Sequence, residues 1–160
     1  MNKAVVTALF SIAFAQALKI PLYFFRTKIW KPKLFFQTGG MPSSHSAGVS
    51  SLTTFIALRR GISTIDFALS LIFGLIVMYD AQGIRRQTGE LTLKVNSLDE
   101  LVRKAHEHEP ILYENQTQMK LKDMLGHQPS EVIGGALIGV LIGTMSYIAE
   151  KNIGNKRRFM

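Results

Sequence analysis

The sequence contains no cysteine among its 160 residues and only one tryptophan. Without cysteine, neither a disulfide framework nor a zinc site built from thiolates can form. Acidic residues are also few, since 11 aspartates and glutamates stand against 19 lysines and arginines, for a formal net charge of +8. A positive surplus of this size points either to nucleic acid or to an anionic membrane as partner.

The placement of the basic residues decides between these partners. They gather at the ends of long uncharged stretches, at residues 26–33, 59–60, 85–86 and 156–158. No helix-turn-helix pattern and no aromatic platform for single strands accompanies them. Basic residues that flank apolar segments are typical of contacts with anionic lipid headgroups. We therefore expect a membrane, and no nucleic acid, as partner.

Four stretches are expected to be membrane-spanning helices, residues 4–25, 42–58, 66–85 and 132–149. About 20 helical residues cross the hydrocarbon core of a bilayer. We predict an all-α fold, an integral-membrane bundle of about four transmembrane helices that forms a single domain over residues 1–160. The second stretch is rich in serine, so its neighbours should shield it. A capping-box pattern, Ser63 with Asp66, marks the expected start of the third.

A polar extramembrane segment, residues 87–126, separates the third and fourth stretches. Ser97 and Glu100 form a capping box before apolar residues at helical spacing, which predicts a short amphipathic helix from Leu98 to about residue 108. A second short helix is expected over residues 116–125. His106 and His108 stand two apart and cannot share a helix face, so we interpret them as solvated rather than as metal ligands.

Three glycines recur every four residues in the last apolar stretch, at Gly135, Gly139 and Gly143. This spacing puts them on one face of a helix, where small residues let a second helix approach closely. We predict that they serve packing, because nothing about them requires chemistry.

Polar residues interrupt the apolar stretches near their ends, and antiparallel packing brings all of these ends together. Lys19 lies late in the first stretch, and Ser43, Ser44 and His45 open the second. The third closes with Asp80, Arg85 and Arg86, and His127 and Glu131 open the fourth. An ionisable residue such as Asp80 within a span is functional by default, although pairing with Lys19 or Arg85 would make it structural.

The chemistry of this collection suits a phosphate group. Lys19 with Arg85 or Arg86 supplies positive charge, and a helix start that follows two glycines and a proline presents backbone N–H groups to an anion. The hydroxyls of Ser43 and Ser44 add further donors to the phosphate. Glu131 stands four residues after His127 and can orient its imidazole. A second histidine, His45, opens another helix. Two histidines and two cations describe phosphoryl transfer through a phosphohistidine.

Three blocks of the sequence resemble a known family, in the same order and over nearly the whole chain. They are residues 39–47 (GGMPSSHSA), 77–86 (VMYDAQGIRR) and 125–132 (LGHQPSEV). This pattern is similar to the divergent, YuiD-like branch of the phosphatidic acid phosphatase type 2 superfamily, which is related to vanadium haloperoxidases.

The resemblance implies roles for individual residues. His127 matches the nucleophilic histidine, and Glu131 replaces its aspartate partner. His45 matches the general acid, and the backbone from Ser43 to His45 matches the phosphate-binding segment, with Ser44 in place of glycine. Lys19 is the best counterpart of the superfamily lysine. No Arg-Pro follows it at the usual distance, and Leu121 stands where the later arginine is expected, so Arg85 is the candidate to supply that charge.

From these observations we expect a multi-pass lipid phosphatase of the cell membrane. Its substrate would be an anionic membrane lipid with a phosphomonoester, such as phosphatidylglycerol phosphate or an isoprenyl phosphate, and the family mechanism needs no metal or other cofactor. The alternative is a non-catalytic membrane module that binds anionic headgroups or a partner protein. A transporter built around Asp80 would need either an inverted repeat, which the sequence lacks, or assembly into an oligomer. The sequence leaves the oligomeric state open, a homo-oligomer included.

Overall fold

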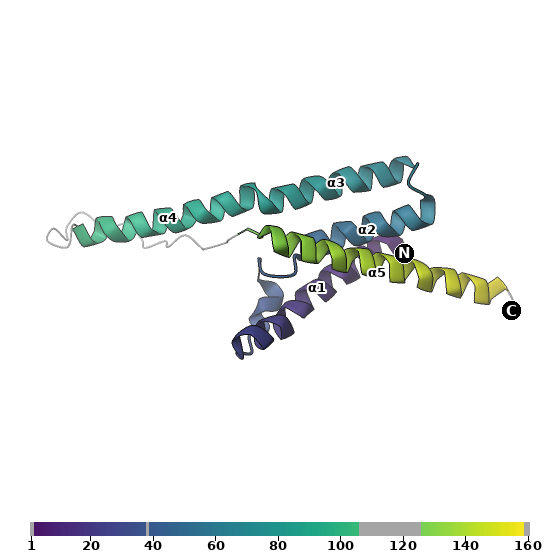
Figure 1. Ribbon diagram of the computed structural model, residues 1–160, viewed down its shortest axis with the longest axis horizontal. Helices are drawn as coiled ribbons and strands as arrows, with labels where there is room; N and C mark the ends of the chain where they lie inside the picture. Colours follow the sequence, from purple (N-terminus) through teal and green to yellow (C-terminus); the bar gives the residue numbers. More distant parts are fainter. Residues whose placement is uncertain (1, 38, 106–125, 159–160) are drawn as a thin grey trace.

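The computed structural model describes residues 2–37, 39–105 and 126–158. All regular structure in these ranges is helical, which confirms the all-α prediction (Figure 1). The elements are α1 (Lys3–Thr27), the 3₁₀ helix η1 (Pro32–Phe36), α2 (Ser44–Arg60), α3 (Ile65–Gln82), α4 (Ile84–Ala105) and α5 (Pro129–Arg158).

The helices α1, α2, α3 and α5 form a membrane bundle. In the described residues, three helical stretches are long and apolar enough to cross a membrane: Lys3–Thr27, Ile65–Val102, which begins with α3, and Pro129–Ile153. The shorter and more polar α2 packs against α1, α3 and α5. Its buried side includes Ser46, Ser51 and Phe55, so the prediction that neighbours shield this segment is confirmed.

The bundle carries its large apolar side chains outside and small or hydroxylated ones inside. Leu69, Ile76 and Leu141 are exposed, whereas Ser11 and Ala47 are fully buried. The Ser11 hydroxyl donates to the Ala47 carbonyl oxygen over 3.0 Å and so links α1 to α2. Lipid does not drive helices together by the hydrophobic effect, and small residues with interhelical hydrogen bonds hold them instead.

The glycines of α5 have the packing role that their spacing predicts. A Cβ atom at Gly135 would collide with the Ser43 carbonyl oxygen, and one at Gly139 with the Ala47 carbonyl oxygen. At Gly143 it would lie 2.7 Å from the Ser51 carbonyl oxygen. The backbone of α5 therefore lies directly on the backbone of α2, an approach that any side chain on this stripe would block.

Two predicted helix starts are wrong. The helix expected to begin at Leu98 begins at Ile84 and continues through this position, and the Ser97 hydroxyl donates backwards to the Leu93 carbonyl oxygen over 2.9 Å. A serine in mid-helix can bond the preceding turn instead of capping a new helix. For α3 the N-cap is Thr64, whose hydroxyl accepts the Phe67 N–H. The helix predicted over residues 116–125, as well as His106 and His108, lies outside the described residues.

Candidate functional site

The segment before α2 is shaped by two glycines and closed by a serine cap. Gly39 and Gly40 have φ values of 84° and 79°, in the left-handed region that favours glycine. Ser43 is the N-cap residue, and its hydroxyl oxygen accepts hydrogen bonds from the Ser46 N–H (3.3 Å) and hydroxyl (3.1 Å). Ser43 and Ser44 are both buried. The Ser43 hydroxyl, predicted to contact phosphate, thus holds the helix start.

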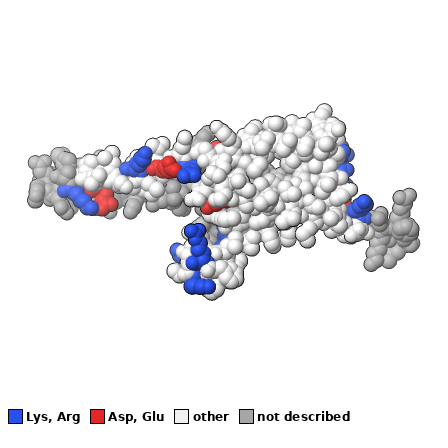
Figure 2. Space-filling view, in the orientation of Figure 1, with Lys and Arg blue, Asp and Glu red and all other residues white. Residues whose placement is uncertain are grey.

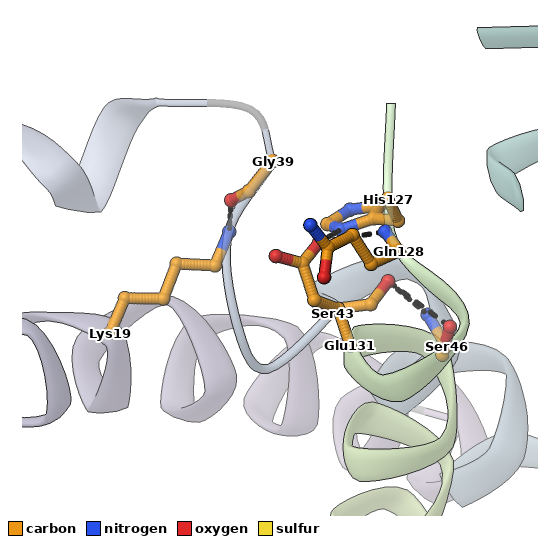
Figure 3. Close-up of polar contacts among 7 residues, drawn as sticks. All are labelled: Lys19, Gly39, Ser43, Ser46, His127, Gln128 and Glu131. Carbon is orange, nitrogen blue, oxygen red and sulfur yellow. Dashed lines mark hydrogen bonds and ion pairs between the residues drawn. The ribbon is translucent and has the colours of Figure 1, made fainter. Parts of the chain in front are cut away.

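His127 and Glu131 form a bonded pair at the start of α5. The imidazole Nδ1 of His127 lies 2.9 Å from the Glu131 Oε2, and the same oxygen accepts the Gln128 N–H over 3.1 Å (Figure 3). The histidine is only 4% exposed. A carboxylate at Nδ1 fixes the ring and directs Nε2 away from the acid, which is the arrangement that a nucleophilic histidine requires.

Backbone hydrogen bonds bring the ends of the helices together. The Ser43 N–H donates to the Glu131 carbonyl oxygen over 2.9 Å and joins α2 to α5. The His127 N–H donates to the Ala81 carbonyl oxygen over 3.0 Å and joins the segment before α5 to the end of α3. The site therefore lies at one end of the bundle, where the antiparallel arrangement predicts it.

The two histidines face each other across the starts of α2 and α5. The ring centroids of His45 and His127 are 6.1 Å apart, and the rings are inclined by 67°. His127 is buried, whereas His45 is exposed. The exposed ring of His45 therefore lies beside the buried ring of His127.

Lys19 reaches the site from α1. Its ammonium donates to the Gly39 carbonyl oxygen over 2.7 Å (Figure 3), and the residue is 4% exposed. Lys19 and Glu131 also attract each other electrostatically. Because an ammonium has three donors, its bond to Gly39 leaves donors for an anion. The buried Lys19 thus holds the segment of Gly39 and Gly40 against α1.

The remaining predicted site residues lie in α3 and α4. Arg86 lies in the first turn of α4, where its guanidinium Nε donates to Glu90 over 3.0 Å along the same helix. Arg85 precedes it in α4, and its side chain lies outside the description. Asp80 is half-buried in the last turn of α3. Arg86 is therefore not among the residues that the structure joins to the histidine pair.

Sequence reasoning missed Ser46 and Gln128, which hold the site through the contacts described above. Ser46 stands three residues after the cap Ser43, where a capping partner is expected. Gln128 contributes its backbone N–H, a contact for which the sequence carries no signal. In the described ranges, no group of three histidines, aspartates or glutamates could hold a metal ion.

Basic residues follow Lys19 at the end of α1 and in η1. Arg26 lies in the last turn of α1, Lys28 caps it and Lys33 lies in η1. Figure 2 shows blue side chains gathered below the bundle, in the region where α1 ends in Figure 1, and the surface of the bundle in this view carries few charges. Positive charge of this kind attracts anionic lipid headgroups.

A membrane bundle with a paired-histidine site at one end is the class of protein that these observations define. Residues 1–142 match the family described as Divergent PAP2 family, and the chain belongs to this family. It is 42% identical over 145 residues to the uncharacterized membrane protein YuiD of Bacillus subtilis (strain 168), a match that covers 88% of this chain and 91% of that protein. No solved structure matches the chain. These findings support a multi-pass membrane protein.

Proposed function

We propose that this protein is an integral-membrane lipid phosphatase that hydrolyses a phosphomonoester through a phosphohistidine. The observation that carries this proposal is the contact between His127 and Glu131, with His45 facing the same ring. A headgroup-binding protein needs cations and helix starts, but it does not need a buried imidazole held by a carboxylate opposite a second imidazole. Membership of the Divergent PAP2 family supports the same chemistry.

The reaction follows from the roles of the two rings. Nε2 of His127 attacks phosphorus, the bond from phosphorus to the lipid oxygen breaks, and His45 donates a proton to that oxygen. Water then attacks the phosphohistidine, His45 accepts the proton of the water, and inorganic phosphate leaves from a regenerated His127. Glu131 holds the ring during both steps and stabilises the charge that develops on it.

Positive groups bind the phosphate oxygens during both steps. Lys19 and Arg85 are the proposed side chains. The start of α2 adds backbone N–H groups of Ser44 and His45, which point along the helix axis with the positive end of its dipole. Because Gly39 and Gly40 carry no side chains, the segment before α2 lets an anion approach closely.

A lipid substrate fits the location of the site. Three of the helices that frame it, α1, α3 and α5, belong to stretches that are long and apolar enough to cross a membrane. Ends of such helices lie near the headgroups, and basic residues stand at the end of α1 and in η1. We propose a phosphatidylglycerol phosphate-like phospholipid or an isoprenyl phosphate as substrate.

The direct test is release of inorganic phosphate by the purified protein in detergent with a chelator present. The panel contains phosphatidylglycerol phosphate, phosphatidic acid and an isoprenyl phosphate, and His127→Ala protein is the blank. Release above this blank from at least one lipid is expected. No release from any of them by folded protein would contradict the proposal.

One observation favours a second candidate function, a non-catalytic module for anionic headgroups. Arg26 and Lys28 at the end of α1 and Lys33 in η1 are cations that phosphoryl transfer does not need, and they would attract anionic headgroups. A binding module would retain its affinity for anionic vesicles in His127→Ala protein and would release no phosphate. A phosphatase would lose turnover in the same variant.

Replacing His45 tests the acid step separately. We expect His45→Ala to lower turnover of a lipid phosphate by about 10²- to 10⁴-fold, because an alkoxide leaves poorly without a proton. An aryl phosphate with an acidic phenol needs no such help, so its turnover should fall much less. Turnover of both substrates measures this difference, and an equal loss for both would argue that His45 binds phosphate instead.

A further inference from the structure

Outside the site, α4 carries an apolar stripe with the spacing of a coiled coil. Leu91, Val95 and Leu98 are 60%, 50% and 61% exposed, and they follow one another at intervals of four and three residues. The same alternation continues to Thr88 and to Val102. In heptad terms the d positions are Leu91 and Leu98, and the a positions are Thr88, Val95 and Val102. The 22 residues of α4 thus hold about three heptads.

The opposite face of α4 carries charged residues that pair within the helix, with Leu93 as an apolar residue among them. Arg86 bonds Glu90 over 3.0 Å, and Lys104 bonds Glu100 over 2.9 Å, each four residues apart. These residues occupy c and f positions, which face away from a coiled-coil seam. Figure 2 shows both signs of charge along α4 beside a bundle with few charges. One side of α4 is therefore suited to water and the other to a partner.

The direction of α4 argues against burial of its stripe in the bilayer surface. Figure 1 shows α4 continuing α3 almost along one line, and the Gln87 N–H donates to the Gly83 carbonyl oxygen across the junction. The 18 residues of α3 alone extend over about 27 Å, close to the thickness of the hydrocarbon core, so a straight continuation of α3 leads away from the bilayer. Among the described helices, α4 contacts only α3.

We propose that α4 forms a parallel two-stranded coiled coil with α4 of a second copy of this chain. Valine at a with leucine at d favours two parallel strands. Two copies inserted in one membrane with the same topology present α4 on the same side, and the two helices must then run parallel. The side-chain pattern and the membrane topology thus favour the same arrangement.

Charge complementarity supports this partner. In a parallel pair, a g residue faces the e residue five positions later in the other strand. Lys94 occupies g and Asp99 occupies e, and both are exposed. Each strand of the dimer would therefore place a lysine opposite an aspartate of its partner, once on either side of the seam.

Anchoring in the membrane compensates for the short length of the coil. Three heptads are marginal for free peptides in water. In the protein, α3 holds each α4 at the membrane with its direction fixed, which raises the effective concentration of one strand around the other.

The absence of cysteine makes the test direct, because one introduced thiol is the only thiol. Leu98→Cys places a thiol at d, and Leu93→Cys places one at f after removal of an equally apolar residue. Full-length protein in its membrane is oxidised and analysed for covalent dimers. We expect about tenfold more dimer from Leu98→Cys than from Leu93→Cys, because only the d position brings two Cβ atoms within disulfide distance.

Charge reversal gives an independent check in the Leu98→Cys background. Lys94→Asp alone and Asp99→Lys alone should each lower the dimer yield, and the two together should restore it. Equal yields at residues 93 and 98, no dimer at either, or a covalent product with a different protein would overturn the proposal. So would strong quenching of a fluorophore at residue 98 by brominated lipid, since that places the stripe in the bilayer. None of these outcomes depends on phosphatase activity.

Discussion

His127→Ala protein is expected to release phosphate at least about 10³-fold more slowly than the wild type, because removal of a nucleophile leaves only binding and charge stabilisation. Alanine provides no atom that can bond phosphorus, and the Glu131 carboxylate loses the imidazole that it holds at 2.9 Å. The measurement is the initial rate of phosphate release from the best lipid substrate, with equal amounts of folded protein.

The variant His127→Asn separates loss of the nucleophile from loss of packing. An asparagine amide can still donate to Glu131, so the start of α5 should retain its structure while the reaction stops. Thermal unfolding of both variants in detergent checks this point. Substantial turnover by His127→Asn would mean that the ring positions the substrate without bonding phosphorus, and the phosphohistidine mechanism would then be wrong.

The location of the site could be predicted because few polar residues interrupt the apolar stretches. Once consecutive helices alternate in direction, Lys19, His45 and His127 have to lie at the same end, and the structure places them there. The spacing of Glu131 after His127 also predicts their contact, since residues four apart on a helix are neighbours. The sequence pattern is therefore sufficient to predict contacts within one helix, and to predict which helix ends meet when the topology allows one arrangement.

The partners of Lys19 and of the Ser43 hydroxyl could not be predicted in this way. Whether an ammonium bonds a carbonyl oxygen or awaits a phosphate depends on the path of the segment around Gly39, which tertiary packing sets. Whether a serine at a helix start caps its own helix or faces a ligand depends on its rotamer. The sequence supports both outcomes with the same residues.

The start of α4 is difficult to predict for a different reason. The Ser97 and Glu100 pattern has the spacing of a capping box, yet it lies in mid-helix because the Ser97 hydroxyl bonds the Leu93 carbonyl oxygen. Because α4 continues through Ser97, the residues at intervals of three and four from Thr88 to Val102 form one continuous stripe. A local capping pattern can thus occur inside a helix whose apolar residues follow a longer periodic pattern.

Gly139→Ala should destabilise the bundle strongly, by about 3 kcal/mol, at the upper end of what an overpacked core typically costs. A Cβ atom there would collide with the Ala47 carbonyl oxygen and lie 2.8 Å from the Ser50 Cβ and 2.9 Å from the Ser51 backbone nitrogen. Since two of these atoms belong to the backbone of α2, no rotamer change relieves the contact, and α5 has to move away. Thermal unfolding in detergent measures the loss.

Gly134→Ala is the matched control, because the same change is made five residues earlier in the same helix. Its Cβ would lie 3.1 Å from the terminal methyl of Met41, which is the end of a flexible side chain and can move. Alanine also favours a helix over glycine by about 1 kcal/mol, so Gly134→Ala should be neutral or stabilising. Propensity acts alike on both variants, so a lower melting temperature for Gly139→Ala alone isolates the contact between α5 and α2. Equal melting temperatures would mean that α5 stands further from α2 in the membrane. The start of α5, with His127 and Glu131, would then not be fixed against Ser43 by this packing.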